Sequence, residues 1–246
     1  MGQGFLMALL IVAGLIHYAS VDGGAVEQGE GYGIESPAGA GNSSSQSNGS
    51  AGEDGTEAVE EAPAVSKIYA QPPEMTIDET KTYEATVHTN KGDFTIELFP
   101  HEAPVTVNNF VFLSREGYYN DVTFHRIVQS FMIQTGDPTG TGAGGPGYKF
   151  KDELNSPFRY EPGVVAMANS GPDTNGSQFF ICTGPDSDYL NQMPNYTIFG
   201  RVTDGMDTVR AIAATPVGKQ KQTGEESAPV EAVTIQSVDI VEKDAS

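Results

Sequence analysis

The chain has 246 residues, 38% of them hydrophobic, which is enough for one good-sized domain or two small ones. Its 33 acidic and 13 basic side chains give a formal net charge of −20, and this argues against nucleic-acid binding because phosphate contacts need clustered Lys and Arg. The single cysteine, Cys182, excludes an internal disulfide and a multi-cysteine metal site, and four scattered histidines suggest no metal either. We expect Cys182 to be a small buried residue of a strand.

The first segment in chain order is a continuous apolar run, FLMALLIVAGLI, at residues 5–16. As a helix it would be about 18 Å long, short of the roughly 30 Å hydrocarbon core of a membrane, and this length is typical of a signal peptide. We therefore interpret residues 1–25 as an apolar leader that directs export and contacts the membrane. Because only the α-amino group supplies positive charge, two alternatives stay open: an uncleaved anchor extending through Ala19, or a start codon assigned too late.

An acidic segment rich in Gly and Ser follows at residues 26–74. From Asp22 to Glu74 the chain carries ten carboxylates and one lysine. Such a composition buries too little apolar area to offset the entropy of ordering the chain, so it predicts a disordered, extended linker. We expect it to tether a folded domain at residues 75–246 to a membrane or cell wall, although an incidental spacer is an equal alternative. The predicted location is extracytoplasmic, either secreted or membrane-tethered.

Short alternating apolar runs begin at Tyr83 and predict strands. YEATVHTNKGDFTIELF reads as a hairpin with Asn90, Gly92 and Asp93 at its turn. APVTVNNFVFLSREGYY has the apolar spacing of a helix that starts near Pro104 and ends near Gly117. Further strands are predicted at TFHRIV, FMIQTGD, GVVAMAN, SQFFICTG, TIFGRVT and AVTIQSVDIV, with a second helix at GMDTVRAIAA. Many short strands and two helices predict a mainly antiparallel barrel capped by helices.

The run GTGAGG at residues 140–145 matches the glycine pattern of a dinucleotide-binding turn. That motif requires the glycines to open a helix, whereas Pro146 and Gly147 follow here and lead into a β-like run. We therefore interpret the segment as a mobile surface loop and not as a nucleotide site.

Four stretches taken together resemble one family: TFHRIVQSFMIQTGD, GTGAGGPGYKFKDE, GVVAMANSGPDTNGSQFFICTG and YTIFGRV. They are similar to the cyclophilins, which are peptidyl-prolyl cis/trans isomerases, and the similarity runs from about Tyr83 to Val241, with bacterial members looking closest. The resemblance implies a closed eight-stranded antiparallel barrel capped by two helices. It also implies an enzyme without a cofactor.

The resemblance assigns roles to individual residues. Arg126 matches the family's catalytic arginine. The positions that match the proline pocket and the peptide-binding groove are His125, Phe131, Met132, Gln134, Gly140, Ala168, Asn169, Gln178, Phe180 and Leu190. Many eukaryotic members have a tryptophan where Tyr189 aligns and a histidine where Tyr196 aligns, so we expect weak binding of the cyclic peptide cyclosporin.

The residue types fit this chemistry independently. Rotation about an X–Pro bond must break amide resonance, and a guanidinium that keeps its proton can donate a hydrogen bond to the prolyl nitrogen as the bond twists. The residues alone also fit structural alternatives. In these, Arg126 is the partner of a carboxylate, Phe131, Met132 and Phe180 are ordinary core, and Gln178 satisfies buried backbone groups.

The functional prediction is an exported monomeric isomerase that accelerates the folding of other exported proteins by acting on their X–Pro bonds. A peptide-binding chaperone module with little turnover is the first alternative, and a β-barrel carrier of a small apolar ligand is the second. Arg126 separates the first two hypotheses, because catalysis needs it and peptide binding does not.

Overall fold

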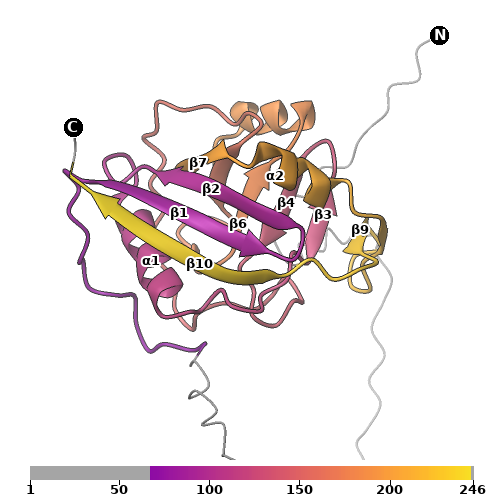
Figure 1. Cartoon of the computed structure of the whole chain (residues 1–246), viewed down its shortest axis with the longest axis horizontal. Coiled ribbons are helices and arrows are strands. Elements are labelled where there is room, and N and C mark those ends of the chain that lie inside the picture. The colour runs from indigo at the N-terminus through magenta and orange to yellow at the C-terminus, as the bar shows by residue number, and fades with distance from the viewer. Residues whose placement is uncertain (1–66, 245–246) are drawn as a thin grey trace, which may run out of the picture. The chain divides into compact units, whose positions relative to one another are not determined.

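The computed structural model describes residues 67–244, all of which belong to one compact unit. The apolar leader and most of the acidic segment lie outside the described residues. Figure 1 shows the arrangement of the elements. In chain order they are β1 (Thr82–Thr89), β2 (Gly92–Leu98), α1 (Pro104–Arg115), β3 (Arg126–Val128), β4 (Met132–Thr135), β5 (Val164–Met167), β6 (Phe179–Cys182), η1 (Pro185–Gln192), β7 (Ile198–Asp204), α2 (Met206–Ala213), β8 (Val217–Lys219), β9 (Glu226–Pro229) and β10 (Ile235–Lys243).

Eight strands form one sheet in the order β10-β1-β2-β7-β5-β6-β4-β3, with antiparallel pairing throughout. The expected closed barrel is wrong, because β10 and β3 end the sheet and form no ladder with each other in the described part. The chain just before β3 bonds instead to the first residue of β10 and to the residues before it. These contacts are the bridge between Thr123 and Thr234 and backbone hydrogen bonds such as Phe124 N to Val233 O and Ile235 N to Val122 O, both 2.9 Å. The sheet is an open, curled half-barrel, and its short end strand β3 lies beside β9 (Figure 1).

The predicted hairpin and both predicted helices are confirmed. Gly92 has φ = +114°, a left-handed conformation that favours glycine and turns the chain from β1 into β2. In α1, Pro104 lies in the first turn, where its missing N–H costs nothing. The free N–H groups of Val105 and Thr106 donate to the Glu153 carboxylate at 3.1 and 2.9 Å.

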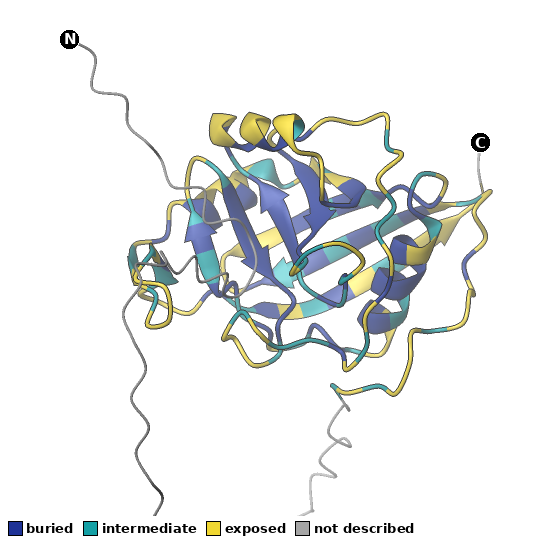
Figure 2. Cartoon of the chain, turned by 180° about the vertical axis from the view of Figure 1, so that it is seen from behind, coloured by how far each residue is buried: buried dark blue, intermediate teal, exposed yellow. Residues whose placement is uncertain are grey.

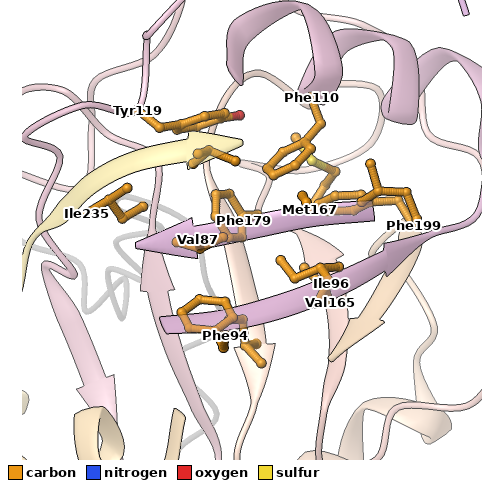
Figure 3. Close-up of a cluster of buried hydrophobic side chains, with 14 of the residues drawn as sticks. Val87, Phe94, Ile96, Phe110, Tyr119, Val165, Met167, Phe179, Phe199 and Ile235 are labelled. Carbon is orange, nitrogen blue, oxygen red and sulfur yellow. The ribbon is translucent and has the colours of Figure 1, made fainter. Parts of the chain in front are cut away.

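The inner face of the sheet is packed with a large apolar core. Figure 3 shows aromatic and branched side chains from several strands and from α1 filling this space. The ring of Phe110 in α1 lies 5.4 Å from that of Phe179 in β6 and 5.3 Å from that of Phe199 in β7. Ring pairs at such distances add to the stabilisation from buried area. The core therefore fixes the positions of strands β4 to β7. Residues on the opposite face of the same strands form the second cluster described next.

Strands β5 and β6 are buried on both faces, so their residues divide between two clusters. Val165, Met167, Phe179 and Ile181 join the inner core. Ala166, Phe180 and Cys182 join a second, smaller cluster on the outer face. The burial of Cys182 confirms the prediction, and burial raises the pKa of its thiol to about 12.

A 3-10 helix and a two-stranded hairpin were not predicted from the sequence. Most residues of the short 3-10 helix η1 are exposed (Figure 2), and its buried Leu190 belongs to the outer cluster. Strands β8 and β9 form a separate two-stranded sheet between α2 and β10. Both elements consist of short polar segments with little apolar periodicity, and for this reason the sequence pattern does not reveal them.

The described residues begin inside the segment assigned to the linker. The Tyr69 ring packs against Phe112 and Tyr118 at 5.3 and 6.3 Å, and its N–H donates to Pro146 O at 2.7 Å. Asn108 of α1 donates to Glu74 O at 2.9 Å. Residues 67–74 thus contact the domain. Among residues 67–244, no helix is long and apolar enough to cross a membrane.

Candidate functional site

Strand register brings four residues into one row on the outer face. Arg126 of β3 is opposite Gln134 of β4, Gln134 is opposite Phe180 of β6, and Phe180 is opposite Ala166 of β5. Directly paired residues of adjacent strands project from the same face. The arginine and the glutamine therefore lie beside the phenylalanine, although about 50 residues of chain separate the two β-segments.

Apolar side chains form a cluster next to this row. Six positions expected in the proline pocket or groove belong to it: Met132, Ala168, Phe180, Leu190 and Tyr196, with Phe131 packed against them. The rings of Phe180 and Tyr196 meet edge to face at 5.6 Å. Met132 and Phe180 are completely buried, whereas Phe131 is half-buried. The cluster thus places apolar side chains beside the guanidinium of Arg126.

Arg126 lies between this cluster and a carboxylate. Its Nε and Nη2 atoms donate to the two carboxylate oxygens of Glu225, each at 2.7 Å, and its Nη1 lies 3.7 Å from Met132 Sδ. Only 13% of the arginine side chain is exposed. Burial alone would raise the pKa of Glu225, but the hydrogen bonds and charge of Arg126 outweigh it and hold the pKa below its usual value. The Glu225 carboxylate is therefore ionised at neutral pH.

His125, the neighbour of Arg126, is 93% buried, and its two ring nitrogens have no hydrogen-bond partner within the described residues. Burial lowers the pKa of this imidazole to about 4, against the opposing charge of Asp137 and with a smaller contribution from Arg126. The ring is neutral at physiological pH. The ring lies against the glycine-rich loop at Gly142 and is buried by it, so it packs under this loop and is not exposed on the surface.

Side-chain amides line the side of the row that faces the glycine-rich loop. Gln134 Nε2 donates to Gln178 Oε1 at 2.9 Å, and Gln178 Nε2 donates to the carbonyls of Gly142 and Gly144 at 3.0 and 2.8 Å. Gln178 thus satisfies backbone carbonyls, as the structural alternative proposed. The buried Gln134 Oε1 has no hydrogen-bond partner in the described part of the chain.

Asp137 organises the glycine-rich loop, for which the sequence predicts a mobile surface segment. Its Oδ2 accepts the N–H groups of Gly142 and Gly144 at 2.7 and 3.1 Å, and its Oδ1 accepts that of Thr139 at 2.7 Å. Gly140 is exposed and has φ = +66°, which suits the turn. Residues 140–147 form bends and no helix, whereas the glycines of a dinucleotide-binding turn open a helix.

The remaining expected groove residues differ in exposure. Asn169 is half-buried, and its Nδ2 donates to Asn195 O at 2.9 Å. Tyr196 is buried, and burial raises the pKa of its phenol to about 12. Tyr189 is 44% exposed in η1 and lies outside the apolar cluster that contains its neighbour Leu190. Tyr196 therefore belongs to the apolar cluster, whereas Tyr189 lies outside it.

Sequence reasoning did not identify Glu225, Asp137 or Gln220 as parts of this region. Gln220 Nε2 donates to His125 O at 2.7 Å and joins the β8–β9 hairpin to β3. Neither spacing nor composition distinguishes Glu225 from its neighbour Glu226, because the choice depends on which strand lies beside β3. Asp137 gave a weak signal, since an aspartate before a glycine-rich turn commonly accepts backbone N–H groups.

The chemistry available here is that of a fixed cation beside an apolar cluster. Residues 67–244 contain no group of three or more His, Cys, Asp or Glu side chains able to hold a metal ion. Arg126 supplies directed N–H donors, and the partly dry surroundings strengthen their electrostatic effect. The site suits a reaction that needs a hydrogen bond to a developing lone pair on an extended chain.

Comparison with known proteins establishes the class. Residues 84–240 match the family described as "Cyclophilin type peptidyl-prolyl cis-trans isomerase/CLD". This match covers more than half of the chain, and the chain belongs to that family of prolyl isomerases.

Two relatives illustrate the range of proteins that contain this domain. The peptidyl-prolyl cis-trans isomerase-like 1 of Emericella nidulans is 45% identical over 163 residues, which are 65% of this chain and 95% of the relative. The mouse peptidylprolyl isomerase domain and WD repeat-containing protein 1 is 48% identical over 155 residues, which are 61% of this chain. The chain spans only 24% of the mouse protein and its human counterpart.

Solved structures agree with the family and the fold. A cyclophilin type peptidyl-prolyl cis-trans isomerase of Cryptosporidium parvum has a TM-score of 0.58 and 35% identity, and the match covers 65% of this chain and 98% of that one. A second structure of the same protein, determined in the presence of the dipeptide Ala-Pro, has a TM-score of 0.58 and 36% identity.

Proposed function

We propose that this protein catalyses cis/trans isomerisation of X–Pro bonds in extended peptides, with Arg126 as the catalytic residue. The observation that carries this proposal is the position of Arg126 Nη1 beside Met132, at the edge of the apolar cluster. A proline ring in that cluster places its nitrogen near an N–H donor. The Ala-Pro dipeptide present with the Cryptosporidium parvum structure supports a proline-containing ligand.

The proposed mechanism is stabilisation of a twisted amide. In the planar peptide bond the nitrogen lone pair is shared with the carbonyl, and the barrier to rotation is about 18–20 kcal/mol. As the bond twists, the lone pair localises and accepts a hydrogen bond from Arg126. Because this bond is stronger in the twisted state than in the planar one, it lowers the barrier without proton transfer.

The neighbouring residues have proposed supporting roles. Phe131, Met132 and Phe180 hold the proline ring, so that the preceding carbonyl is the part that rotates. The unpartnered Gln134 Oε1 and the half-buried Asn169 lie where they can bind the backbone of an extended peptide. A peptide N–H is the matching partner for the Gln134 oxygen, since a buried acceptor without a partner is unfavourable.

A peptide-binding module with little turnover is the second candidate, because the pocket and amides alone suffice for binding. The carrier of a small apolar ligand has less support, since aromatic side chains occupy the inner side of the sheet (Figure 3). The charged, directed donor at the pocket favours catalysis over both.

We also propose that the protein is exported, that its substrates are proline-containing segments of unfolded exported proteins, and that it acts as a monomer of bacterial origin. The apolar run at residues 5–16 and the acidic segment at 26–74 support export and a tether. Resemblance of the quoted motifs to bacterial family members supports the origin. Detection of the mature protein in an extracytoplasmic fraction tests the location.

A prolyl-isomerisation assay on the full chain tests the activity, with Arg126→Ala and the exposed Arg210→Ala as a matched pair. Loss of one preorganised donor should raise the barrier by about 2–4 kcal/mol, a rate decrease of roughly 30- to 900-fold. Arg210→Ala should isomerise at the wild-type rate. Equal turnover in both variants would refute the mechanism, and a wild-type protein that binds proline peptides without turnover would establish the binding module instead.

A further inference from the structure

The β8–β9 hairpin supplies the carboxylate that binds Arg126. Glu225, directly before β9, occupies both the Nε and the Nη2 donors of the guanidinium, each at 2.7 Å. Bidentate pairs of this kind fix orientation as well as charge, because two parallel hydrogen bonds lock the plane of the guanidinium. Only the Nη1 end of the arginine remains directed toward Met132 and the apolar cluster.

The hairpin is itself fixed, so Glu225 has a defined place. Ser227 Oγ donates to Glu225 Oε2 at 2.8 Å, and Gln220 N donates to Glu225 O at 2.7 Å. The side chain of Gln220 in turn donates to the backbone oxygen of His125, the residue before Arg126. One turn therefore contacts β3 twice, through an amide on the backbone and through a carboxylate on the arginine side chain.

We propose that Glu225 is a positioning residue for isomerisation, which orients Arg126 so that its Nη1 donors face the prolyl nitrogen. This inference rests on the proposed function. A long arginine side chain has several rotamers, and restricting it to one before the substrate binds removes an entropic cost from the catalytic step. Glu225 accepts from Nε and Nη2, whereas Nη1 is the atom beside Met132, so the carboxylate holds the cation without binding the Nη1 donors.

A competing role makes the opposite prediction. If Glu225 only neutralised Arg126, removing its charge would strengthen the donor and speed isomerisation. If the pair were only structural, its loss would lower thermal stability and leave kcat unchanged. Kinetic and stability measurements on the same variants separate these roles.

The test compares Glu225→Gln with Glu226→Gln in the full chain. Glu226 is the exposed neighbour on the same hairpin, so both variants lose one negative charge at almost the same place. We expect Glu225→Gln to lower kcat about tenfold with KM within twofold, because the free arginine samples orientations that miss the prolyl nitrogen. Ser227→Ala, which removes one donor to Glu225, should give a smaller decrease. Equal kcat in the two glutamine variants, or a higher kcat in Glu225→Gln, would overturn the proposal.

A second readout does not depend on activity. In the wild type, the Nε–H of Arg126 should give a sharp nitrogen-15 NMR signal that exchanges slowly with water, because Glu225 holds it. The signal should broaden or vanish in Glu225→Gln and persist in Glu226→Gln. A wild-type protein without turnover but with the protected signal contradicts the proposed function alone, whereas an unprotected signal in the wild type contradicts the positioning role.

Discussion

The two faces of strands β3 to β6 use alternate residues of the same short segments for different purposes. On the inner face, Ile127, Ile133 and Ile181 pair across the strands and belong to the closed core. One residue along, on the outer face, Arg126 and Gln134 pair beside the apolar cluster. The core fixes the register in which β3, β4 and β6 pair. This register is what brings Arg126 and Gln134 together on the outer face. Stability and chemistry are therefore separable by single substitutions.

The adjacent residues Phe179 and Phe180 provide the strongest test of this separation. Both are completely buried, but Phe179 faces the inner core and Phe180 the outer cluster. Phe179→Ala should lower the free energy of unfolding by about 3–5 kcal/mol, the range for large cavities in a packed core. Phe180→Ala should destabilise less and should raise KM for proline peptides. Urea unfolding and steady-state kinetics measure the two effects, and an equal profile for both variants would refute the division of faces.

The pH dependence of stability tests the buried state of His125, the residue before Arg126. His125 has a folded-state pKa of about 4, below the ordinary value of 6.5. The unfolded chain therefore binds a proton between about pH 6.5 and pH 4 that the folded protein does not bind, so His125 lowers stability as the pH falls through this window, by up to about 3 kcal/mol. His125→Asn should flatten the stability profile there. His101→Asn, at an exposed position, should keep the wild-type slope, and a slope retained in both variants would show that His125 is not its source.

Before β1, residues 67–74 contact the domain, and residues 1–66 lie outside the described part of the chain. Two truncations measure what the contacts of residues 67–74 contribute to stability. Removal of residues 1–74 deletes the Tyr69 contacts with Phe112 and Tyr118. It should lower stability by about 2 kcal/mol, the scale for an apolar side chain returned to water. Removal of residues 1–66 should leave the melting temperature unchanged. Identical melting of both truncated proteins would show that the contacts of residues 67–74 contribute nothing.

The smallest expected effect concerns the rim of the outer face. Tyr189 is 44% exposed, so a hydrogen bond made there is only partly shielded from water. Tyr189→Trp should tighten cyclosporin binding by about 1 kcal/mol at unchanged turnover, because an indole N–H restores a donor with a different reach from that of the phenol. Titration against the isomerase activity measures this change. Unaltered affinity would indicate that the tyrosine does not occupy the tryptophan position.

Local sequence patterns predicted most of the elements in this fold. Short apolar runs, some alternating and some continuous, predicted the eight strands of the large sheet, and the spacing from Val107 to Leu113 predicted α1. Closure of the sheet was not predictable, because it depends on how far β3 and β10 extend and on the hairpin that lies beside β3. Capping of α1 by Glu153 joins residues about 47 positions apart, and no local pattern reports such a contact.

The sequence predicted those site residues that lie in continuous motifs. It did not predict those that only the folded chain brings next to them. Residues around Arg126 and Phe180 stand in long motifs, and the structure brings them into one row. Glu225 lies in a polar turn whose residues look alike, so only the folded chain reveals which carboxylate meets the arginine. The buried, neutral state of His125 likewise depends on the loop above it, which Asp137 shapes.

The pairing of β1 with β10 has a consequence for how the protein is made. Thr82 pairs with Lys243, so the first and last strands of the domain are 161 residues apart in the chain. At a synthesis rate of about 5–20 residues per second, roughly 8 to 32 s pass between the emergence of the two strands from the ribosome. During this interval one side of β1 lacks its partner, and an unpaired strand edge promotes association with other chains. The large sheet therefore stays incomplete until β10 has been synthesised.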